Sequence, residues 1–196
     1  MKKILFIGDS IMYGVRGLPG YGEFVEQKLR DKAKVILPND NCQDVRYTYD
    51  FLEELFDLEN IRTADIVYWN NGLWDLLHFC GNPKPHTEIK LYLEFIEKLY
   101  LKINDLAKGA KIIFSTTTYI PEELQKTRSY RRNSEIAEYN QAVCKLLEKY
   151  NVAIHDLCEV AKTFGVEYRC ADGLHFSKIG SEKLSNYVVS FINQYI

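Results

Sequence analysis

The sequence has no apolar run that approaches the roughly 20 residues of a membrane-spanning helix. It also lacks an excess of either charge, because 25 Lys and Arg stand against 27 Asp and Glu and the formal net charge is −2. A nucleic-acid-binding protein usually shows a clear basic excess. The sequence therefore predicts neither a membrane span nor a nucleic-acid partner, and it leaves the oligomeric state open.

Cysteines are few and scattered, and no two of them form a Cys-x-x-Cys pair. The 5 cysteines are Cys42, Cys80, Cys144, Cys158 and Cys170. An odd number without such pairs is typical neither of a disulfide framework nor of a structural zinc site, so we expect free thiols. The apolar run Ile4–Ile7 after Lys2 and Lys3 ends at Gly8, well short of the about 7–15 apolar residues of a signal peptide. We therefore expect a cytoplasmic protein.

What the chain does have is the composition of a globular protein. Of its 196 residues, 46% are hydrophobic and 27% are charged. This length predicts a single domain over residues 1–196 that buries roughly 70% of its unfolded surface. The aromatic share of 13% fits a well-packed core or an aromatic-lined pocket.

Strand-like and helix-like patterns alternate along the chain. Short apolar runs typical of strands buried on both faces are Lys3–Ile7, Val35–Leu37, Ile66–Trp69, Lys111–Phe114 and Val152–Ile154. Three- and four-residue apolar spacing predicts helices over Tyr21–Arg30, Tyr49–Leu58, Ile89–Leu106, Ile136–Tyr150 and Leu184–Ile192, with Ser177 as an N-cap. Such alternation predicts an α/β fold with a parallel sheet and helices on both faces.

In open parallel sheets, ligands bind beyond the carboxyl ends of the strands. The segments to search are therefore Gly8–Ser10, Pro38–Asp44, Asn70–Asp75, Ser115–Tyr119 and the loop that leads to Asp172 and His175. Two long loops also stand out. One is Gly81–Pro85, and the other is Glu122–Asn133, which carries Lys126, Arg128, Arg131 and Arg132.

Two short motifs in these segments suggest nucleophilic catalysis. Ser10 directly follows the first strand, and a serine becomes a nucleophile when a histidine, oriented by a carboxylate, takes its proton. Asp172-Gly173-Leu174-His175 offers that pair just before the last helix. Each motif alone has an ordinary structural interpretation, Ser10 as a helix N-cap and His175 as a histidine bonded to Asp172.

With these motifs, the sequence resembles the SGNH hydrolases, also called GDSL esterases and lipases. Gly8-Asp9-Ser10 matches the family's first block, and Asp172-x-x-His175 matches its last. The resemblance implies a flavodoxin-like, three-layer α/β/α fold with a five-stranded parallel sheet, and esterase chemistry without a cofactor or metal. It also implies that Ser10 attacks an acyl carbonyl, His175 relays the proton and Asp172 orients His175.

The middle blocks depart from the family pattern. In Gly72-Leu73-Trp74-Asp75, Trp74 stands where the family has an oxyanion-binding Asn, and no Gly follows the second strand, where Asn41 and Cys42 lie. Losing one oxyanion donor costs about 2.7–4 kcal/mol of transition-state stabilisation. We expect the oxyanion hole to draw on the backbone N–H groups of Ser10 and of Asn41 or Cys42. A further donor would come from Asn70, Asn71 or Trp74.

Three residues of the matched motifs, Asp9, Gly72 and Asp75, are candidates for substrate binding. For Asp75, a buried carboxylate that caps the following helix is the interpretation we favour over direct chemistry. The basic residues of the Glu122–Asn133 loop form either a solvated face or a lid that holds a carboxylate or phosphate of the substrate. Aromatic side chains that could line an acyl or sugar pocket, or equally pack in the core, are Trp69, Trp74, Tyr119 and Tyr130.

Other chemistries stay open at this point. Asp75-x-x-His78 is a second Asp-x-x-His motif, and with Asp172 and His175 it could bind a metal for a metal-dependent hydrolase. Cys42 could act as a nucleophile instead of Ser10, although a buried structural thiol is more common.

A third alternative is a degenerate esterase that only binds a small molecule.

The other histidines are given no catalytic role. His155-Asp156 is interpreted as structural, because adjacent residues point apart, and His86 receives no role. The favoured hypothesis is a serine hydrolase of carboxylic esters, acting on a short acyl ester or an acetylated carbohydrate.

Overall fold

The computed structural model describes residues 1–15, 17–79, 81–125 and 128–196. A parallel sheet of five strands runs through the centre in the order β4-β1-β5-β7-β9. These strands are β1 (Lys2–Ile7), β4 (Ala33–Ile36), β5 (Ile66–Trp69), β7 (Lys111–Ser115) and β9 (Ala153–His155). The order 2-1-3-4-5 is that of flavodoxin-like folds, so the predicted fold class is confirmed.

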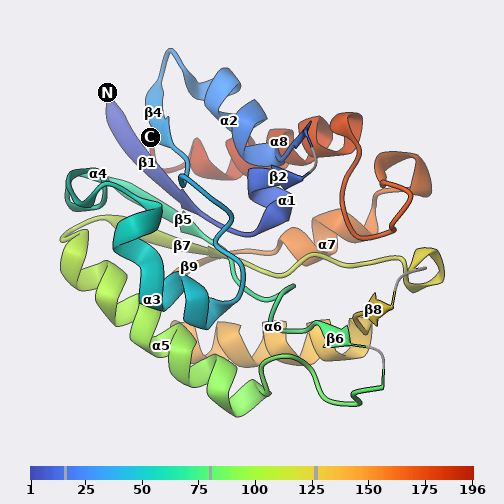
Figure 1. Cartoon of the computed structure of the whole chain (residues 1–196). Helices are drawn as coiled ribbons and strands as arrows, with labels where there is room; N and C mark the ends of the chain where they lie inside the picture. The colour runs from blue at the N-terminus through green and yellow to red at the C-terminus, as the bar shows by residue number, and fades with distance from the viewer. Residues whose placement is uncertain (16, 80, 126–127) are drawn as a thin grey trace.

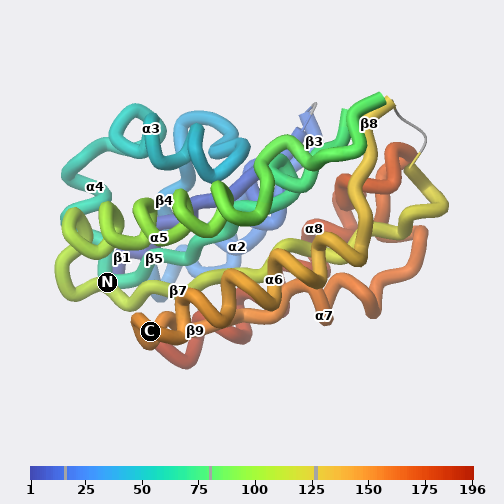
Figure 2. Tube along the Cα trace, turned by 90° about the horizontal axis from the view of Figure 1, so that it is seen from below, coloured from blue at the N-terminus to red at the C-terminus, as the bar shows by residue number. Residues whose placement is uncertain are grey.

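Helices cover both faces of the sheet, as Figures 1 and 2 show. One face carries α2 (Tyr21–Leu29) and α8 (Lys178–Ile192), which pack against each other. The other carries α3 (Val45–Leu55), α5 (Ile89–Leu106) and α6 (Asn133–Glu148), with α5 in contact with both of its neighbours. The strands all end at the same edge, on the right in Figure 1, and both chain termini lie at the opposite edge.

Short elements complete the chain, mostly at the edge where the strands end. They are α1 (Ser10–Tyr13), β2 (Gly14–Val15), β3 (Leu18–Pro19), α4 (Leu58–Arg62), β6 (His78–Phe79), β8 (Ser129–Tyr130), α7 (Leu157–Lys162) and two 3-10 turns at Glu122–Leu124 and Val166–Tyr168. β2 pairs with β3 and β6 pairs with β8, both antiparallel. Strands of two residues carry no readable alternation, so the sequence did not predict them.

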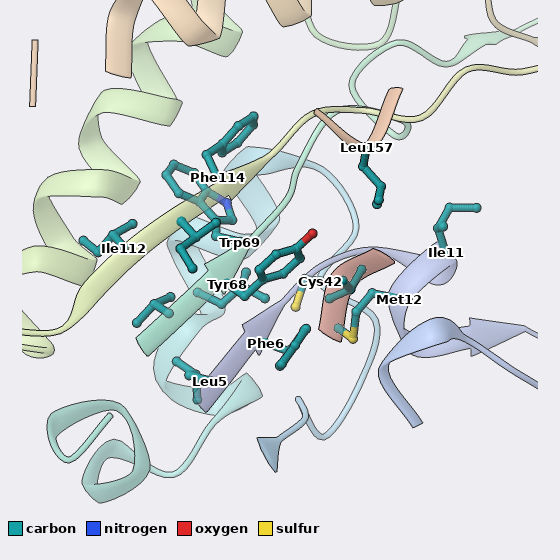
Figure 3. Packing of buried hydrophobic residues seen from close by; sticks show 14 of the residues in the cluster. Leu5, Phe6, Ile11, Met12, Cys42, Tyr68, Trp69, Ile112, Phe114 and Leu157 are labelled. Carbon is teal, nitrogen blue, oxygen red and sulfur yellow. The ribbon is translucent and has the colours of Figure 1, made fainter. Parts of the chain in front are cut away.

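The central strands form because their side chains are apolar on both faces. Every residue of β5 is fully buried, and Figure 3 shows Tyr68 and Trp69 packed between Phe6 and Phe114 of the neighbouring strands. Trp69 meets Phe114 edge to face, with ring centroids 5.1 Å apart. Burial of aromatic side chains of this size dominates core energetics. The core therefore runs through the sheet into both helical layers.

The helix ends follow local capping. Asp44 accepts the N–H groups of Arg46 and Tyr47, so α3 begins at Val45 rather than at the predicted Tyr49. The same predicted segment is also interrupted, because Asp57 caps a separate helix, α4. Ser177 caps α8 as predicted, since its hydroxyl accepts the N–H of Gly180. The apolar periodicity of α5 predicted both of its ends correctly.

No helix in the described part of the chain is long and apolar enough to cross a membrane.

Candidate active site

Ser10 lies at the turn where β1 ends. Asp9 is the N-cap of α1, and its Oδ1 accepts the N–H of Ile11 at 2.9 Å. This cap turns the chain sharply out of the strand and makes Ser10 the first residue of the helix. Ser10 retains 9% exposure, and its own N–H, at the first position of a helix, has no acceptor within that helix.

The last motif brings a histidine and a carboxylate to this serine. Ser10 Oγ lies 2.8 Å from His175 Nε2, and His175 Nδ1 lies 2.8 Å from Asp172 Oδ2. The chain separates Ser10 from His175 by 165 residues, so only the fold unites them. In this geometry Nδ1–H donates to the carboxylate and Nε2 is left to accept the serine proton. The arrangement can therefore activate Ser10 as a nucleophile.

Asp172 is held as an anion by a local turn. Its Oδ1 accepts the N–H groups of Leu174 and His175 at 2.9 and 3.0 Å. Burial raises the pKa of Asp172, but the hydrogen bonds from His175 and Leu174 and the charge of His175 outweigh it, so the pKa lies below its usual value of 3.8. The carboxylate is consequently ionised at neutral pH and keeps its hydrogen bond to His175.

Arg169 positions the loop that carries Asp172 and His175. It was not among the residues predicted from the sequence. Its Nη2 donates to the Tyr119 carbonyl at 2.9 Å, and its guanidinium lies 3.8 Å from the centre of the Phe176 ring. Burial lowers the pKa of Arg169 to about 10. The side chain therefore ties the end of this loop to the segment after β7. A lone Arg in a loop gives no sequence signal for such a role.

The structure directs Asn71 away from the nucleophile. Its side-chain amide donates to the Gln43 carbonyl at 3.1 Å and to Thr48 Oγ1 at 2.8 Å, while its Oδ1 accepts the Trp69 indole N–H at 2.7 Å. Asn71 is fully buried. Both N–H groups of its side-chain amide are thus bonded within the protein, and neither is free to donate to an oxyanion.

The loop after β4 is also satisfied internally. The N–H of Asn41 donates to Asp40 Oδ1 at 2.6 Å, and that of Cys42 donates to the Gly8 carbonyl at 3.3 Å. The next N–H, of Gln43, donates to Asn41 Oδ1 at 2.9 Å, in a residue with a φ of 52°. Asn41 and Cys42 were the expected sources of a second oxyanion donor. In this conformation neither has a free N–H, because both N–H groups bond within the protein.

Cys42 itself belongs to the core. Its side chain is fully buried, and Figure 3 shows its sulfur among Phe6, Tyr68 and Met12. Burial raises the pKa of the thiol to about 12. A neutral, enclosed thiol is a poor nucleophile. The interpretation of Cys42 as a small buried thiol is the one that the geometry supports.

Asp9 and Gly72, two of the substrate-binding candidates, are buried. Asp9 is 1% exposed, and burial raises the pKa of its carboxyl. Gly72 is buried against Thr117, whose side chain occupies the place of a Cβ, so only glycine fits there. Asp9 lines a small cavity with Leu73, whereas Gly72 packs against Thr117.

Asp75 is a structural carboxyl, but it caps a different helix from the one expected. It is fully buried, and its two oxygens accept the N–H of Val45, at the start of α3, at 3.4 and 3.3 Å. Burial, followed by the charge of Asp44, raises the pKa of Asp75 well above its usual value. Asp75 therefore has no exposed atom in this structure with which to contact a substrate.

His78 lies apart from His175 and makes its own pair. Its Nε2 lies 2.6 Å from Glu135 Oε2, and its ring stacks on Tyr130 with centroids 4.9 Å apart. The two Asp-x-x-His motifs therefore do not share a site. In the described residues, no group of three or more His, Cys, Asp or Glu side chains is placed to hold a metal ion. The metal-hydrolase alternative thus lacks the ligand cluster that it needs.

The remaining candidates have structural surroundings. His155 Nδ1 lies 2.7 Å from the Tyr68 hydroxyl, burial lowers its pKa to about 4, and Asp156 turns away to cap α7. Trp69 is fully buried in the core, whereas Trp74 is half-buried. Of the basic residues in the Glu122–Asn133 loop, Arg128 is exposed, Arg131 is buried, Arg132 pairs with Glu135, and Lys126 lies outside the described residues.

One hollow adjoins the Ser10–His175 pair, and a second lies next to the first. The small one of about 10 Å³ lies directly against the pair, and the wider one of about 570 Å³ shares Gly14, Val15, Leu18 and Pro19 with the first. The wider hollow is further lined by Tyr13, Glu23, Phe24, Gln27 and Lys178. The enclosed space beside the serine is therefore small, and the larger space lies along the β2–β3 hairpin.

A family model described as the GDSL-like lipase/acylhydrolase family matches residues 6–183. That range contains Ser10, Asp172 and His175. A comparison with curated proteins finds no match.

Several solved structures share this architecture. A lipase/acylhydrolase from Enterococcus faecalis is 21% identical with a TM-score of 0.75, covering 99% of this chain and 96% of that one. The acetyl xylan esterase AlAXEase is 20% identical with a TM-score of 0.77, covering 97% of this chain and 99% of that one. A catalytic mutant of an acetylxylan esterase from Geobacillus stearothermophilus is 22% identical with a TM-score of 0.72, covering 96% of this chain and 93% of that one. These likenesses establish the shared fold.

Proposed function

Because the chain belongs to the GDSL-like lipase/acylhydrolase family, we propose that it is a serine hydrolase of carboxylic esters that works through an acyl-enzyme on Ser10. The observation that carries the proposal is the chain of contacts from Ser10 Oγ to His175 Nε2 and from His175 Nδ1 to Asp172 Oδ2, each 2.8 Å long. A helix cap at Ser10 or a surface histidine would not require all three groups to align.

The proposed reaction proceeds in two acyl transfers. Ser10 Oγ forms a bond to the carbonyl carbon while its proton moves to His175 Nε2, and the carbonyl electron pair moves onto the oxygen. His175 then protonates the leaving alcohol as the ester C–O bond breaks. A water molecule, deprotonated by the same nitrogen, attacks the acyl-enzyme and releases the acid and Ser10. Asp172 keeps the imidazole in the required tautomer and stabilises its cationic form.

We propose a short acyl group, with acetyl the natural first candidate. The enclosed space against Ser10 and His175 is only about 10 Å³, which favours a small acyl group. The hollow of about 570 Å³ beyond the hairpin offers room for a larger leaving group. Acetyl xylan esterases are among the proteins with the same fold, which makes acetylated carbohydrate a substrate class worth testing. The cytoplasmic location expected from the sequence stays a prediction.

The test is hydrolysis of p-nitrophenyl acetate and of acetylated xylo-oligosaccharides by the wild-type protein and by Ser10→Ala. We expect turnover by the wild type and a loss of several orders of magnitude in the variant, because the nucleophile is gone. His175→Ala should behave alike, since members of a triad act as a unit. Equal turnover by the wild type and Ser10→Ala would overturn the proposal. No turnover by either would favour a protein that binds its ligand without cleaving it.

A further inference from the structure

Arg131 is a buried cation next to the active site. It lies between β8 and α6, and only 7% of it is exposed. No Asp or Glu of the described residues lies within ion-pair distance of its guanidinium. Burying a charge without a partner is strongly destabilising. Its burial therefore calls for a compensating role, and a negative charge that forms only during the reaction would provide one.

The side chain is held in one position. Its Nε–H donates to the Leu73 carbonyl at 2.6 Å. The backbone N–H and carbonyl of Arg131 both bond to the side-chain amide of Gln125, each at 2.8 Å. Among the described residues, nothing accepts from its two terminal nitrogens. The donors at the tip of the guanidinium are thus fixed in place and available.

Neighbouring residues connect Arg131 to both ends of the site. Leu73, to which it is bonded, lines the same small cavity as Asp9, the neighbour of Ser10. On the other side, Leu124, next to Gln125, packs directly on Gly173 in the loop of Asp172 and His175. The segment that holds Arg131 therefore touches both halves of the site.

The electrostatics agree with this placement. Burial lowers the pKa of Arg131 to about 10, while the charges of Asp9 and Asp172 act in the opposite direction. The guanidinium is therefore charged throughout the pH range in which a histidine base works.

The site otherwise has few donors for a developing oxyanion. The amide of Asn71 is fully engaged, and the N–H groups of Asn41 and Cys42 bond within the protein. Among the described residues, what is left is the Ser10 N–H, the Trp74 indole, the tip of Arg131 and one N–H of the Asn70 amide, whose other N–H donates to the Ser115 carbonyl. Of these, only Arg131 is charged, and a charged donor forms hydrogen bonds roughly twice as strong as a neutral one.

We propose that the Arg131 guanidinium donates to the oxyanion that forms when Ser10 attacks the ester carbonyl. The inference rests on the proposed function. As the Ser10 Oγ–carbon bond forms, the carbonyl electron pair moves onto the oxygen, and the terminal N–H groups of Arg131 stabilise that charge without transferring a proton. Because the charge exists only in the transition state and the tetrahedral intermediate, Arg131 acts on kcat rather than on KM.

The experiment compares Arg131→Met and Arg131→Lys with the wild type on p-nitrophenyl acetate, which carries no negative group on its acyl side. We expect Arg131→Met to lower kcat by about 10²–10³-fold with little change in KM. Arg131→Lys should lose less, because it keeps the charge but not the forked geometry. Arg128→Gln is the matched control. It removes a positive charge from an exposed position of the same loop and should leave kcat unchanged.

A second measurement separates catalysis from folding. Guanidinium chloride, at concentrations far below denaturing ones, should restore part of kcat to Arg131→Ala, whereas sodium chloride of the same ionic strength should not. Arg131→Lys, which preserves charge and approximate length, serves if the shorter variants do not fold. Unchanged kcat in well-folded Arg131→Met and Arg131→Lys would overturn the proposal.

Two further outcomes would also overturn it, and they are distinguishable. If Trp74→Phe, rather than any Arg131 variant, lowers kcat, the indole N–H is the side-chain donor. If Arg131 variants raise KM only for esters that carry a carboxylate, Arg131 binds a substrate anion instead. Failure of the underlying function looks different, because the wild type would then match Ser10→Ala. Turnover that depends on Ser10 but not on Arg131 rejects this inference alone.

Discussion

At the scale of single residues, the carboxyl groups of Asp172 and Asp75 have pKa values shifted in opposite directions. Asp172 accepts hydrogen bonds from His175 and Leu174, and they hold its pKa below 3.8. Asp75 is sealed in the core beside Asp44, and its pKa lies well above 3.8. Similar Asp-x-x-His spacing therefore occurs with a lowered pKa at Asp172 and a raised pKa at Asp75.

For the triad, the first prediction concerns pH. Because the pKa of Asp172 is lowered, its carboxylate is present above its usual pKa, and its contribution disappears only as the pH falls through the still lower folded value. Protonation of Asp172 should therefore not limit kcat/KM at any pH above its usual pKa of 3.8. Asp172→Asn should lower kcat by on the order of 10⁴-fold. A rate that is flat from about pH 5 to 8 would contradict a histidine base.

The second prediction concerns Asp75. The folded protein retains a proton on Asp75 that the unfolded chain releases, so its contribution to the free energy of unfolding declines as the pH rises from its usual pKa toward the raised folded value. Asp75→Asn removes this dependence and should gain stability relative to the wild type with rising pH. Asp75→Ala should lose about 1–3 kcal/mol, because it leaves the Val45 N–H without an acceptor.

Urea unfolding of both Asp75 variants at several pH values from about 4 to 7 measures this. Both variants should keep Ser10-dependent turnover, since Asp75 does not reach the surface of the site. Loss of turnover in a stable Asp75→Asn variant would show that Asp75 acts in catalysis after all.

At the scale of elements, α6 holds the chain after β7 in place through two asparagines. Asn140 accepts the Thr117 N–H and donates to the Thr117 carbonyl, both at 2.9 Å. Asn133 does the same for Ile120, at 3.1 and 2.6 Å. In each case the side-chain amide bonds to both the N–H and the carbonyl of one backbone residue, as a neighbouring strand would. They fix the segment to which Arg169 anchors the loop of Asp172 and His175.

The third prediction follows from this pairing. Asn140→Ala should destabilise the protein by about 1–3 kcal/mol, because it leaves two buried backbone groups of Thr117 unpaired. Gln141→Ala, on the exposed side of the same helix, is the control and should change stability little. Thermal unfolding measures both. Hydrogen exchange at residues 116–118 should rise in the first variant alone, and equal exchange in the two variants would argue against a local clamp.

At the scale of the whole molecule, a single buried cluster extends from the sheet into both helical layers. The two tryptophans sample different parts of the molecule, since Trp69 is in the core and Trp74 is half-buried near the site. A continuous core favours cooperative unfolding, which is typical of a domain that unfolds as one unit.

The fourth prediction tests the single domain directly. Urea transitions followed by far-ultraviolet circular dichroism and by tryptophan fluorescence should coincide, because the same core supports both signals. Ser10→Ala should unfold at nearly the same urea concentration as the wild type, since Ser10 contributes to chemistry more than to packing. Two separated transitions would indicate two units instead of one.

The central strands and the amphipathic helices could be predicted because their signals are local. β5 and α5 lie where the sequence placed them, since a run of buried residues or a 3.6-residue period needs no tertiary information. The two-residue strands β6 and β8, by contrast, exist only because His78 and Tyr130 meet. No pattern in either short segment indicates that pairing.

Order along the chain was enough to predict the alternating α/β frame, the family resemblance and the candidate residues Ser10, Asp172 and His175. The roles of the other polar groups depend on contacts between residues that are distant in sequence. Asn71 and Asp75 have structural roles, because their side chains bond to residues in and just before α3. Arg131 came to lie beside the site because Leu73 and Gln125 hold it there. An N–H group stays free only if no neighbouring acceptor bonds to it. Neighbours that are distant in sequence are set by the fold.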